Sequence, residues 1–343
     1  MRQLLNILFI PLSWLYAVVI WIRNFLYDEH IFLSYQSPIP TICVGNLAVG
    51  GTGKTPMTEY LIQLLSPKYK VAVLSRGYGR KTSGFRVANE NDTAATIGDE
   101  PMLFYQKHPD VPIAVCADRV KGMKRLQKLF PNLQGVILDD AFQHRRLQCG
   151  FYILLTPYDQ LYVHDHMLPW GRLRDLPSQS LRANVIVVTK SPASVQPIDR
   201  RIVNNALQMP SYQSLYFSKI KYAPLELPGT PLIVTGIANP RPLFQHFSEL
   251  YPKTELLDFS DHHVFSDADI QRILNMAKRF SCVVTTEKDY TRLLQTPILQ
   301  LLGDKLYVQS MQTNLGDDQE AFNRDVMLYV SENNRLVQIN TNQ

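Results

Sequence analysis

The chain has 343 residues, a length typical of two domains or of one large one. Hydrophobic residues make up 45% of it, enough for sizeable buried cores. The formal net charge of +5 and the pI of about 8.9 are mild. They suit a surface that meets phosphates or anionic lipid, but many ordinary enzymes share them.

The four cysteines, Cys43, Cys116, Cys149 and Cys282, form no C-x-x-C pair. Most of them lie in or beside apolar runs, so we expect buried, reduced thiols and no zinc site.

The first thirty residues differ from the rest of the chain. From Leu4 to Ile22 the sequence carries no charge, and arginines flank this segment at positions 2 and 23. It has the length of a membrane-crossing helix, about 20 residues, and its tryptophans and tyrosine are types that favour the membrane interface. Asn6, Pro11 and Ser13 weaken its first half as a spanning helix. We expect membrane association rather than a signal peptide or a buried core helix, with a spanning and an interfacial placement both open.

Short apolar runs alternate with helical patterns along the remaining chain. The runs cover residues 41–45, 71–75, 112–116, 135–139, 151–156, 184–190, 231–236, 255–259, 281–289 and 305–309. Residues 57–65, 119–130 and 267–278 have helical patterns, the last preceded by a capping box of Ser266 and Asp269. The alternation predicts parallel sheets with helices on both faces.

We therefore predict an α/β protein with two α/β/α domains, the first a P-loop NTPase-type sheet. The predicted parts are a membrane-associated helix over residues 1–30, a nucleotide-binding domain over 31–160 and a second α/β domain over 161–343. The boundary is placed in the segment 156–181, which is rich in Pro, His and Arg and lacks periodicity.

A phosphate-binding loop follows the first strand of the body. The pattern G-x-x-x-x-G-K-[ST] is met at Gly53, Lys54 and Thr55, but Ala48 replaces the opening glycine. Strand, glycine-bearing turn and helix are the context such a loop requires, and the helix N-terminus attracts anions. Lys54 would reach the β- and γ-phosphates, and Thr55 would ligate Mg²⁺. The predicted nucleotide-binding residues are Ala48, Val49, Gly50, Gly51, Thr52, Gly53, Lys54 and Thr55.

A phosphate loop needs an acid at the end of a neighbouring strand. The run 135–139 ends in Asp139, and Asp140 follows. Adjacent side chains on a strand point in opposite directions, so only one of the two can face the metal. We predict that Asp139 helps to hold Mg²⁺ and that Asp140 faces the reaction centre or a basic partner.

A phosphate loop occurs in several classes of nucleotide-binding protein, and other motifs must distinguish them. A GTPase should carry N/T-K-x-D after a strand, but Pro192 stands in place of the aspartate, which makes guanine recognition doubtful. A membrane-tethered ATPase and a kinase acting on a soluble sugar or nucleotide remain alternatives. A kinase also needs a base for the acceptor hydroxyl and cations for its anionic groups. Polar candidates for these roles occur in residues 75–81, 97–101, 139–146 and 261–263.

Ordered motifs along nearly the whole chain resemble the tetraacyldisaccharide 4'-kinases, the lipid A kinases of Gram-negative bacteria. The matching segments are VGNLAVGGTGKTP (44–56), LSRGYGR (74–80), GDEP (98–101), DR (118–119), LDDAFQHRRL (138–147), LPWGRLRD (168–175), GIANP (236–240), DHHVF (261–265) and TEKD (286–289). The family loop accepts a small residue at the position of Ala48. Asp175 stands where many members would carry a glutamate.

The resemblance implies transfer of the γ-phosphate of ATP, with Mg²⁺, to the 4'-hydroxyl of a tetraacylated glucosamine disaccharide 1-phosphate, giving lipid IVA. It implies Asp99 as catalytic base, assisted by His262 rather than His263. By the same resemblance Glu100 supports the metal or the nucleotide, and Asp139 and Asp140 form the Mg²⁺ centre. Arg76 and Tyr78 touch the lipid, while Arg119, Arg172 and Arg174 meet phosphates or the transition state.

The implied setting is the cytoplasmic face of the bacterial inner membrane, reached through the N-terminal helix. We expect a monomer that meets the membrane surface and the acylated disaccharide, and no nucleic acid. With Asp99 assigned to the first domain and His262 to the second, ATP binding is expected to close a cleft between them. Deleting residues 1–30 is expected to reduce lipid turnover more than ATP binding.

Overall fold

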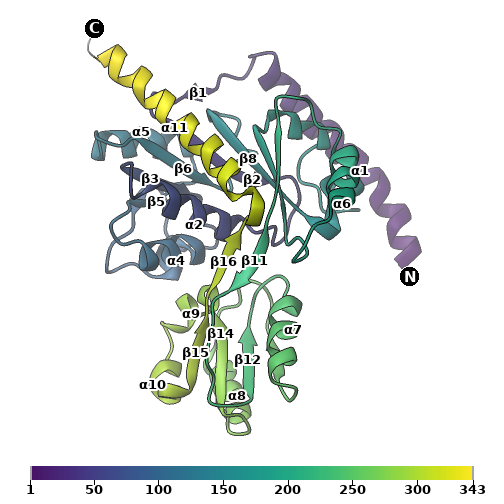
Figure 1. Cartoon of the computed structure of the whole chain (residues 1–343), viewed down its shortest axis with the longest axis vertical. Coiled ribbons are helices and arrows are strands. Elements are labelled where there is room, and N and C mark those ends of the chain that lie inside the picture. The colour runs from purple at the N-terminus through teal and green to yellow at the C-terminus, as the bar shows by residue number, and fades with distance from the viewer. Residues whose placement is uncertain (1, 342–343) are drawn as a thin grey trace. The chain divides into compact units, whose positions relative to one another are not determined.

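The computed structural model describes the backbone of residues 2–341 and the side chains of residues 9–335. The chain forms two compact units (Figure 1). The first unit comprises residues 1–76, 110–220 and 313–343, and the second comprises 77–109 and 221–312. Each unit is an α/β structure with parallel strands, so the predicted α/β class with parallel sheets is confirmed.

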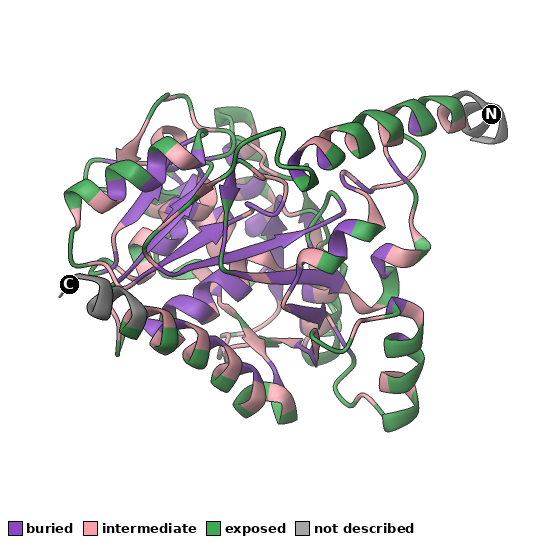
Figure 2. Ribbon diagram, turned by 90° about the horizontal axis from the view of Figure 1, so that it is seen from above, coloured by how far each residue is buried: buried purple, intermediate pink, exposed green. Residues whose placement is uncertain are grey.

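The first unit is built on a parallel sheet that contains the phosphate loop. Its strands run in the order β10-β9-β8-β2-β6-β3-β5. They are β2 (Thr41–Asn46), β3 (Val71–Ser75), β5 (Ile113–Val115), β6 (Gly135–Asp139), β8 (Phe151–Pro157), β9 (Val185–Thr189) and β10 (Ser214–Phe217). Figure 2 shows these strands buried in the interior. Most of their residues are inaccessible, as expected for central parallel strands that are apolar on both faces.

Helices and short elements complete the first unit. The helices are α1 (Arg2–Asp28), α2 (Lys54–Leu65), α5 (Arg119–Leu129), α6 (Pro197–Leu207) and α11 (Gln319–Thr341). Between β8 and β9 lie the 3-10 turns η1 (Tyr158–Gln160), η2 (Tyr162–His164) and η3 (Pro177–Arg182), and η5 (Gly316–Asp318) precedes α11. The two-residue strands β1 (Tyr35–Gln36) and β7 (Leu147–Gln148) pair with each other.

The second unit has a four-stranded parallel sheet in the order β13-β12-β14-β15. Its strands are β12 (Pro231–Thr235), β13 (Glu255–Asp258), β14 (Cys282–Thr286) and β15 (Leu306–Gln309). Its helices are α3 (Ala94–Ile97), α4 (Asp99–Lys107), α7 (Arg241–Leu250), α8 (Asp267–Ala277), α9 (Glu287–Leu293) and α10 (Ile298–Leu302), with η4 (Gly303–Lys305). The remaining strands are β4 (Arg86–Val87), β11 (Lys219–Tyr222) and β16 (Met311–Asn314), of which β11 and β16 pair.

Several local predictions are confirmed. All ten apolar runs contain strands, and Ser266 and Asp269 form the capping box at the start of α8. All four cysteines are free and buried.

The two units do not follow the predicted boundary at residue 160. The run 184–190, assigned to the second domain, forms β9 and pairs with β8 of the first unit. Residues 77–109, assigned to the first domain, belong with the second unit, and so does Asp99. Hydrophobic periodicity identifies a strand but not its neighbour in the sheet, and the chain passes between the units more than once.

Candidate functional site

The phosphate loop joins β2 to α2, as predicted. Gly50 and Gly53 have φ angles of 106° and 89°, which favour glycine. α2 begins at Lys54, one residue after the left-handed Gly53. Backbone N–H groups of such a turn and of the first helical residues point at an anion. The loop therefore has the backbone geometry that a nucleotide phosphate chain needs.

Ala48 occupies a position that does not require glycine. It forms an isolated antiparallel bridge with Leu173, and it is absent from the described residues with positive φ. On either side of this bridge the Val49 N–H donates to the Arg172 carbonyl over 2.8 Å, and the Arg174 N–H donates to the Leu47 carbonyl, also over 2.8 Å. The opening of the loop is thus extended, so the departure from the general motif costs no backbone strain.

Asn46, which the motif analysis did not single out, connects the parts of this site. Its side chain is buried, and its amide group donates to the Ala48 carbonyl over 2.6 Å and to the Thr52 hydroxyl over 2.8 Å. Its amide oxygen accepts from Arg174 over 2.6 Å and from Lys54 over 3.5 Å. The signal available in the sequence was a polar residue at the carboxyl end of a buried strand.

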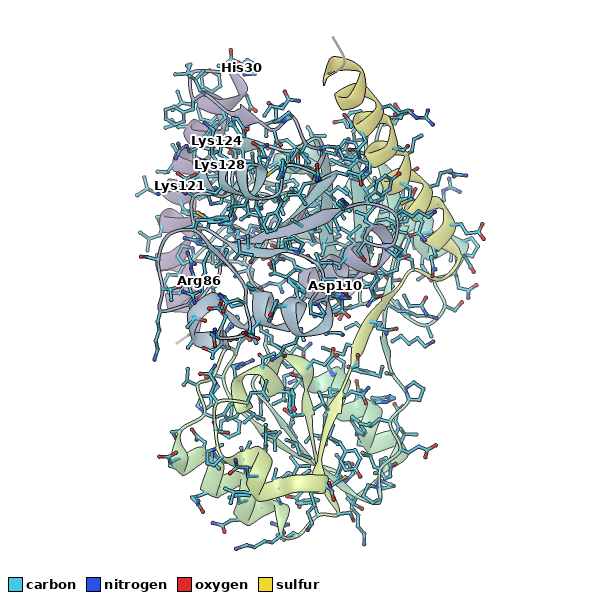
Figure 3. All side chains as sticks on the ribbon, turned by 90° about the vertical axis from the view of Figure 1, so that its left-hand side faces the viewer. His30, Arg86, Asp110, Lys121, Lys124 and Lys128 are labelled. Atoms are coloured by element: carbon cyan, nitrogen blue, oxygen red, sulfur yellow. The ribbon has the colours of Figure 1, made fainter. Side chains whose placement is uncertain are left out.

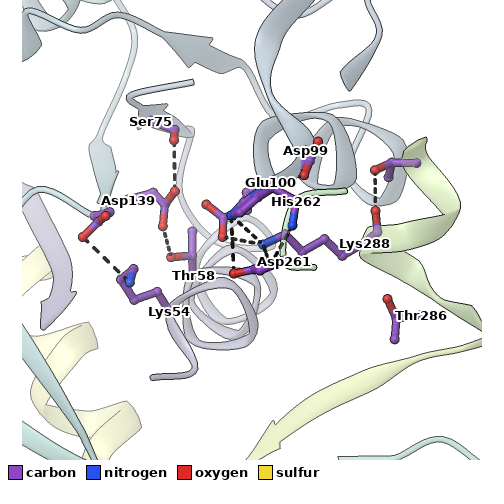
Figure 4. Close-up of polar contacts among 12 residues, drawn as sticks. Lys54, Thr58, Ser75, Asp99, Glu100, Asp139, Asp261, His262, Thr286 and Lys288 are labelled. Atoms are coloured by element: carbon purple, nitrogen blue, oxygen red, sulfur yellow. Dashed lines mark hydrogen bonds and ion pairs between the residues drawn. The ribbon is translucent and has the colours of Figure 1, made fainter. Parts of the chain in front are cut away.

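The carboxyl end of β6 lies beside the loop, because Asp139 is in register with Val44 of β2. The Asp139 carboxylate is buried and accepts from the Ser75 hydroxyl over 3.0 Å and from the Thr58 hydroxyl over 3.3 Å (Figure 4). Thr58 belongs to α2, one helical turn beyond Lys54. The strand-end acid predicted from the sequence is therefore held in a fixed orientation next to the loop.

Asp140 points toward cations. Both of its oxygens accept from the Arg174 guanidinium, and the Lys54 ammonium lies 4.0 Å away. Burial alone would raise the pKa of Asp140, but Lys54, Arg174 and Arg119 outweigh it and hold the pKa below the ordinary value. Asp140 is thus ionised at neutral pH, and it has the basic partners that the sequence predicted.

The other predicted arginines of the first unit occupy different environments. Arg119 is fully buried and donates to the carbonyls of Cys116, Ala117 and Asp140. Burial lowers its pKa to about 10, although Asp139 and Asp140 oppose the shift. Arg172 pairs with Asp165 over 2.9 Å, and Arg76 is exposed. Arg174 pairs with the Asp140 carboxylate, whereas the Arg119 side chain reaches the Asp140 backbone carbonyl.

Asp99 and His262 are brought together within the second unit, which corrects their assignment to different domains. The Asp99 Oδ2 atom lies 3.0 Å from Nδ1 of His262 (Figure 4). Asp99 begins α4 after Gly98, whose φ is 98°. Tyr78, which is 66% exposed, has its ring centroid 5.3 Å from that of His262. The imidazole is therefore held between a carboxylate and an aromatic ring.

The structure separates His262 from His263. The His263 Nε2 atom lies 3.0 Å from Asp269, a residue of the α8 capping box, and its ring stacks on Phe259. His263 thus has a local structural role, whereas His262 reaches Asp99. The two neighbours could not be separated from sequence alone, because their ring directions depend on the φ of 58° at His262.

Two cations beside Asp99 were missed by the sequence analysis. The Arg292 Nε atom lies 3.3 Å from Asp99 Oδ2, and the Lys288 ammonium lies 3.6 Å from Glu100 and 3.4 Å from Nε2 of His262. Burial alone would raise the pKa of Asp99, but the hydrogen bond from His262 and the charges of Arg292 and Lys288 lower it. Lys288 belongs to the TEKD motif, for which the sequence alone indicated no role.

Among the described residues no group of three or more His, Cys, Asp or Glu side chains is arranged to hold a metal ion. A phosphate-loop Mg²⁺ does not need such a group, because one hydroxyl, phosphate oxygens and water supply most of its ligands. Thr55 in the first turn of α2 and the oriented carboxylate of Asp139 fit this mode.

A phosphate loop with an adjacent strand-end acid, together with a carboxylate–imidazole pair, defines a P-loop phosphotransferase, and comparisons with known proteins agree. A model of the tetraacyldisaccharide-1-P 4'-kinase family matches residues 5–330. The tetraacyldisaccharide 4'-kinase of Flavobacterium johnsoniae is 43% identical over 346 residues, covering 97% of this chain and 99% of the relative. That of Bacteroides thetaiotaomicron is 41% identical over 354 residues, covering 95% of this chain and 93% of the relative. The crystal structure of Aquifex aeolicus LpxK in complex with ATP superposes with a TM-score of 0.72 at 26% identity and covers 94% of this chain and 98% of that one.

The chain belongs to the tetraacyldisaccharide 4'-kinase family. It is an ATP-dependent kinase of lipid A biosynthesis, as the resemblance implied.

Proposed function

We propose that Asp99 accepts the proton of the attacking 4'-hydroxyl and that His262 orients it. The observation that carries this proposal is the 3.0 Å contact between Asp99 Oδ2 and His262 Nδ1 inside one compact unit. A base must be ionised before the reaction, and the lowered pKa of Asp99 keeps it so at neutral pH. Arg292 and Lys288 supply the positive charge that stabilises this state.

Lys288 also selects the tautomer of His262. An ammonium group only donates hydrogen bonds, so Nε2 of His262, 3.4 Å from Lys288, acts as the acceptor. Nδ1 then carries the ring proton and donates it to Asp99 over 3.0 Å. His262 therefore holds the carboxylate through a donated hydrogen bond and leaves the other Asp99 oxygen for the substrate hydroxyl.

On the nucleotide side, the loop 48–55 would hold the phosphates of ATP, with Lys54 reaching the transferred group. Phosphoryl transfer depends mainly on positioning and charge neutralisation. Arg174 is fixed by Asp140 and Asn46, so its guanidinium is positioned beside Lys54 before substrate arrives. Mg²⁺, held by Thr55 and the oriented carboxylate of Asp139, would neutralise charge on the phosphates. Glu100 stays a proposed contributor to the metal or nucleotide.

For the acylated disaccharide we propose contacts from Arg76 and Tyr78, which are exposed, and from Arg172. The burial of Arg119 supports a different role, in which its charge acts on the carboxylates of Asp139 and Asp140 and not directly on the substrate. Because the loop and the Asp99–His262 pair belong to different compact units, closure on ATP binding stays a prediction, which small-angle scattering with and without ATP would test.

The test of the residue roles is transfer of label from γ-labelled ATP to a tetraacylated disaccharide 1-phosphate in mixed micelles. Asp99→Ala should lose about 10²–10⁴-fold in kcat, the contribution of a general base, and keep ATP binding. Lys54→Ala should lose both transfer and ATP binding. Asp267→Ala, which removes an exposed acid on α8, is the matched control and should behave as wild type. An Asp99→Ala enzyme within tenfold of wild type would remove Asp99 from the role of base.

We further propose that α1 lies in the membrane interface and does not cross the bilayer. Its segment Phe9–Asp28 is long and apolar enough to span a bilayer, and only 11% of the 18-residue apolar stretch within it is buried. Yet one side of the helix is bonded to the first unit. The Ser13 hydroxyl donates to the Met167 carbonyl over 2.9 Å, and the Asn24 amide donates to Asp175 over 2.8 Å. A helix attached to the protein body at both points would have to break these bonds to cross.

The opposite side of α1 is apolar and exposed, including Trp14 at 72% and Trp21 at 57%. An amphipathic helix of this kind lies with its apolar face among the acyl chains near the headgroups. The proposed location is the cytoplasmic face of the inner membrane, where the acylated substrate would be met. A monomer acting at that surface without nucleic acid remains our expectation.

Depth-dependent quenching by brominated lipids separates the two placements. The chain has three tryptophans, so the variants Trp14→Phe/Trp170→Phe and Trp21→Phe/Trp170→Phe each retain one probe on α1. Seven residues of helix are about 10 Å along the axis. An interfacial α1 keeps both probes at the same shallow depth, whereas a spanning α1 separates them by about 10 Å along the bilayer normal and so places at least one of them near the bilayer centre.

A further inference from the structure

Helix α5 presents a face of four cationic side chains to solvent. Lys121, Lys124, Arg125 and Lys128 are all exposed and line a hollow of about 470 Å³ together with Asp118. Their spacing of three, four and seven residues places them on one side of the helix. In Figure 3 the three lysines lie close together on the side facing the viewer, below His30. We call these four residues the α5 basic face.

The positive charge of the α5 basic face is not compensated within the protein. None of the four groups forms an ion pair in the part of the chain that the structure describes, and Lys124 instead lies 4.9 Å above the ring of Tyr35. The nearby Asp118 already accepts from the Lys121 N–H as the N-cap of α5 and pairs with Arg146 over 3.6 Å. Like charges one turn apart disfavour a helix, so an external anion would relieve their repulsion.

The α5 basic face is connected to the apolar surface of α1 through a short segment. After α1 ends, Ile31, Phe32 and Leu33 are 61%, 44% and 85% exposed. The ring of Phe32 packs against Tyr27 of α1, with centroids 5.3 Å apart. Two residues beyond Leu33, the hydroxyl of Tyr35 contacts Gln127 of α5 over 3.1 Å. Exposed apolar residues therefore lead from α1 directly to the cations of α5.

We propose that the α5 basic face binds the phosphate groups of anionic phospholipid headgroups while residues 31–33 and α1 enter the adjacent bilayer. This inference rests on the proposed interfacial placement of α1. A bilayer offers acyl chains and phosphates side by side, which matches the order of apolar and cationic side chains here. A free phosphate or a soluble nucleotide would use the cations but leave the exposed apolar segment without a partner.

The test compares binding of the full-length protein to vesicles of phosphatidylcholine alone and of phosphatidylcholine with 30 mol% phosphatidylglycerol, by cosedimentation. A surface lysine near an anionic membrane contributes about fivefold in binding, so Lys124→Gln/Lys128→Gln should lose about 25-fold on anionic vesicles. Its binding to neutral vesicles, which reports α1, should not change. Lys68→Gln/Lys70→Gln removes the same charge from exposed sites after α2 and is expected to bind like wild type.

The outcomes separate this inference from the proposed function. Equal losses for both double variants would reduce the effect to net charge and overturn the proposal, as would unchanged anionic binding in Lys124→Gln/Lys128→Gln. Competition by millimolar inorganic phosphate would assign the site to a soluble anion instead. Lipid phosphorylation in neutral detergent micelles should be equal for wild type and both variants. A failure of wild type to bind neutral vesicles at all would count against the membrane role of α1, independently of α5.

Discussion

Replacing Asn46 with alanine removes the side chain that joins the phosphate loop to its cations. The lost bonds are two neutral ones, to Ala48 and Thr52, and one to the Arg174 guanidinium. Neutral hydrogen bonds contribute about 0.5–1.5 kcal/mol each and those to charged groups about 1.5–3 kcal/mol. The sum is about 2.5–6 kcal/mol, and the 3.5 Å contact from Lys54 is too long to add much.

This free energy is divided between folding and binding. The carbonyl of Ala48 is left without its donor, which destabilises the folded loop, and Arg174 is released from one of its two anchors. A loop that must reorganise before it holds ATP binds it less tightly, and each 1.4 kcal/mol is a factor of ten. If half of the free energy falls on binding, the ATP Kd of Asn46→Ala rises about 10–100-fold.

The assay is calorimetric titration of ATP with Mg²⁺, accompanied by thermal unfolding of the ligand-free protein. Asn46→Asp is the comparison variant, because it keeps an oxygen for Arg174 but cannot donate to Ala48 and Thr52. It should bind ATP less well than wild type and retain the Arg174 contact. An Asn46→Ala protein with the wild-type Tm and an ATP Kd within twofold of wild type would refute the proposed connecting role.

Two further predictions concern stability. In Gly45→Ala the added Cβ would lie 2.5 Å from the Cβ of Phe142 and 3.1 Å from its backbone nitrogen, so overpacking should cost about 1–3 kcal/mol and lower the calorimetric Tm by several degrees. In Gly135→Ala the nearest neighbour of the added Cβ is a valine methyl at 3.3 Å, so this variant should lose less, and equal Tm values would contradict the argument. Because the pKa of Asp99 is lowered on folding, its contribution to stability is present above the ordinary value of 3.8 and is lost as the pH falls through the lowered pKa. The difference in free energy of unfolding between wild type and Asp99→Asn, from urea titrations, should thus shrink from pH 7 toward pH 3, and a constant difference would contradict the role of His262 in stabilising the carboxylate.

The sequence predicted the parts of this molecule whose signals are local. Buried parallel strands appear as short apolar runs, and the phosphate loop is a contiguous motif between a strand and a helix. The assignment of residues 184–190 to a second domain was wrong, because this strand pairs with β8 of the first unit. Hydrophobic periodicity predicts that a segment is a strand, but not which strand it pairs with. Asn46, Lys288 and Arg292 were missed for a related reason. Each is an ordinary polar residue in sequence, and its role appears only when distant segments lie together.

Helix α1 shows how the positions of polar residues add to what composition alone predicts. By length and mean hydropathy alone, Phe9–Asp28 could span a membrane. Three of the uncharged side chains that bond to the protein body nevertheless lie on one helical stripe. They are Ser13, Tyr16 and Asn24, spaced three and eight residues apart. Ser13 and Asn24 are 4% and 2% exposed, whereas the intervening tryptophans are mostly exposed. A spanning helix in lipid has no need for a polar stripe, but an interfacial helix held on a protein does. The positions of a few polar residues, rather than the mean hydropathy, therefore determine the expected placement of α1.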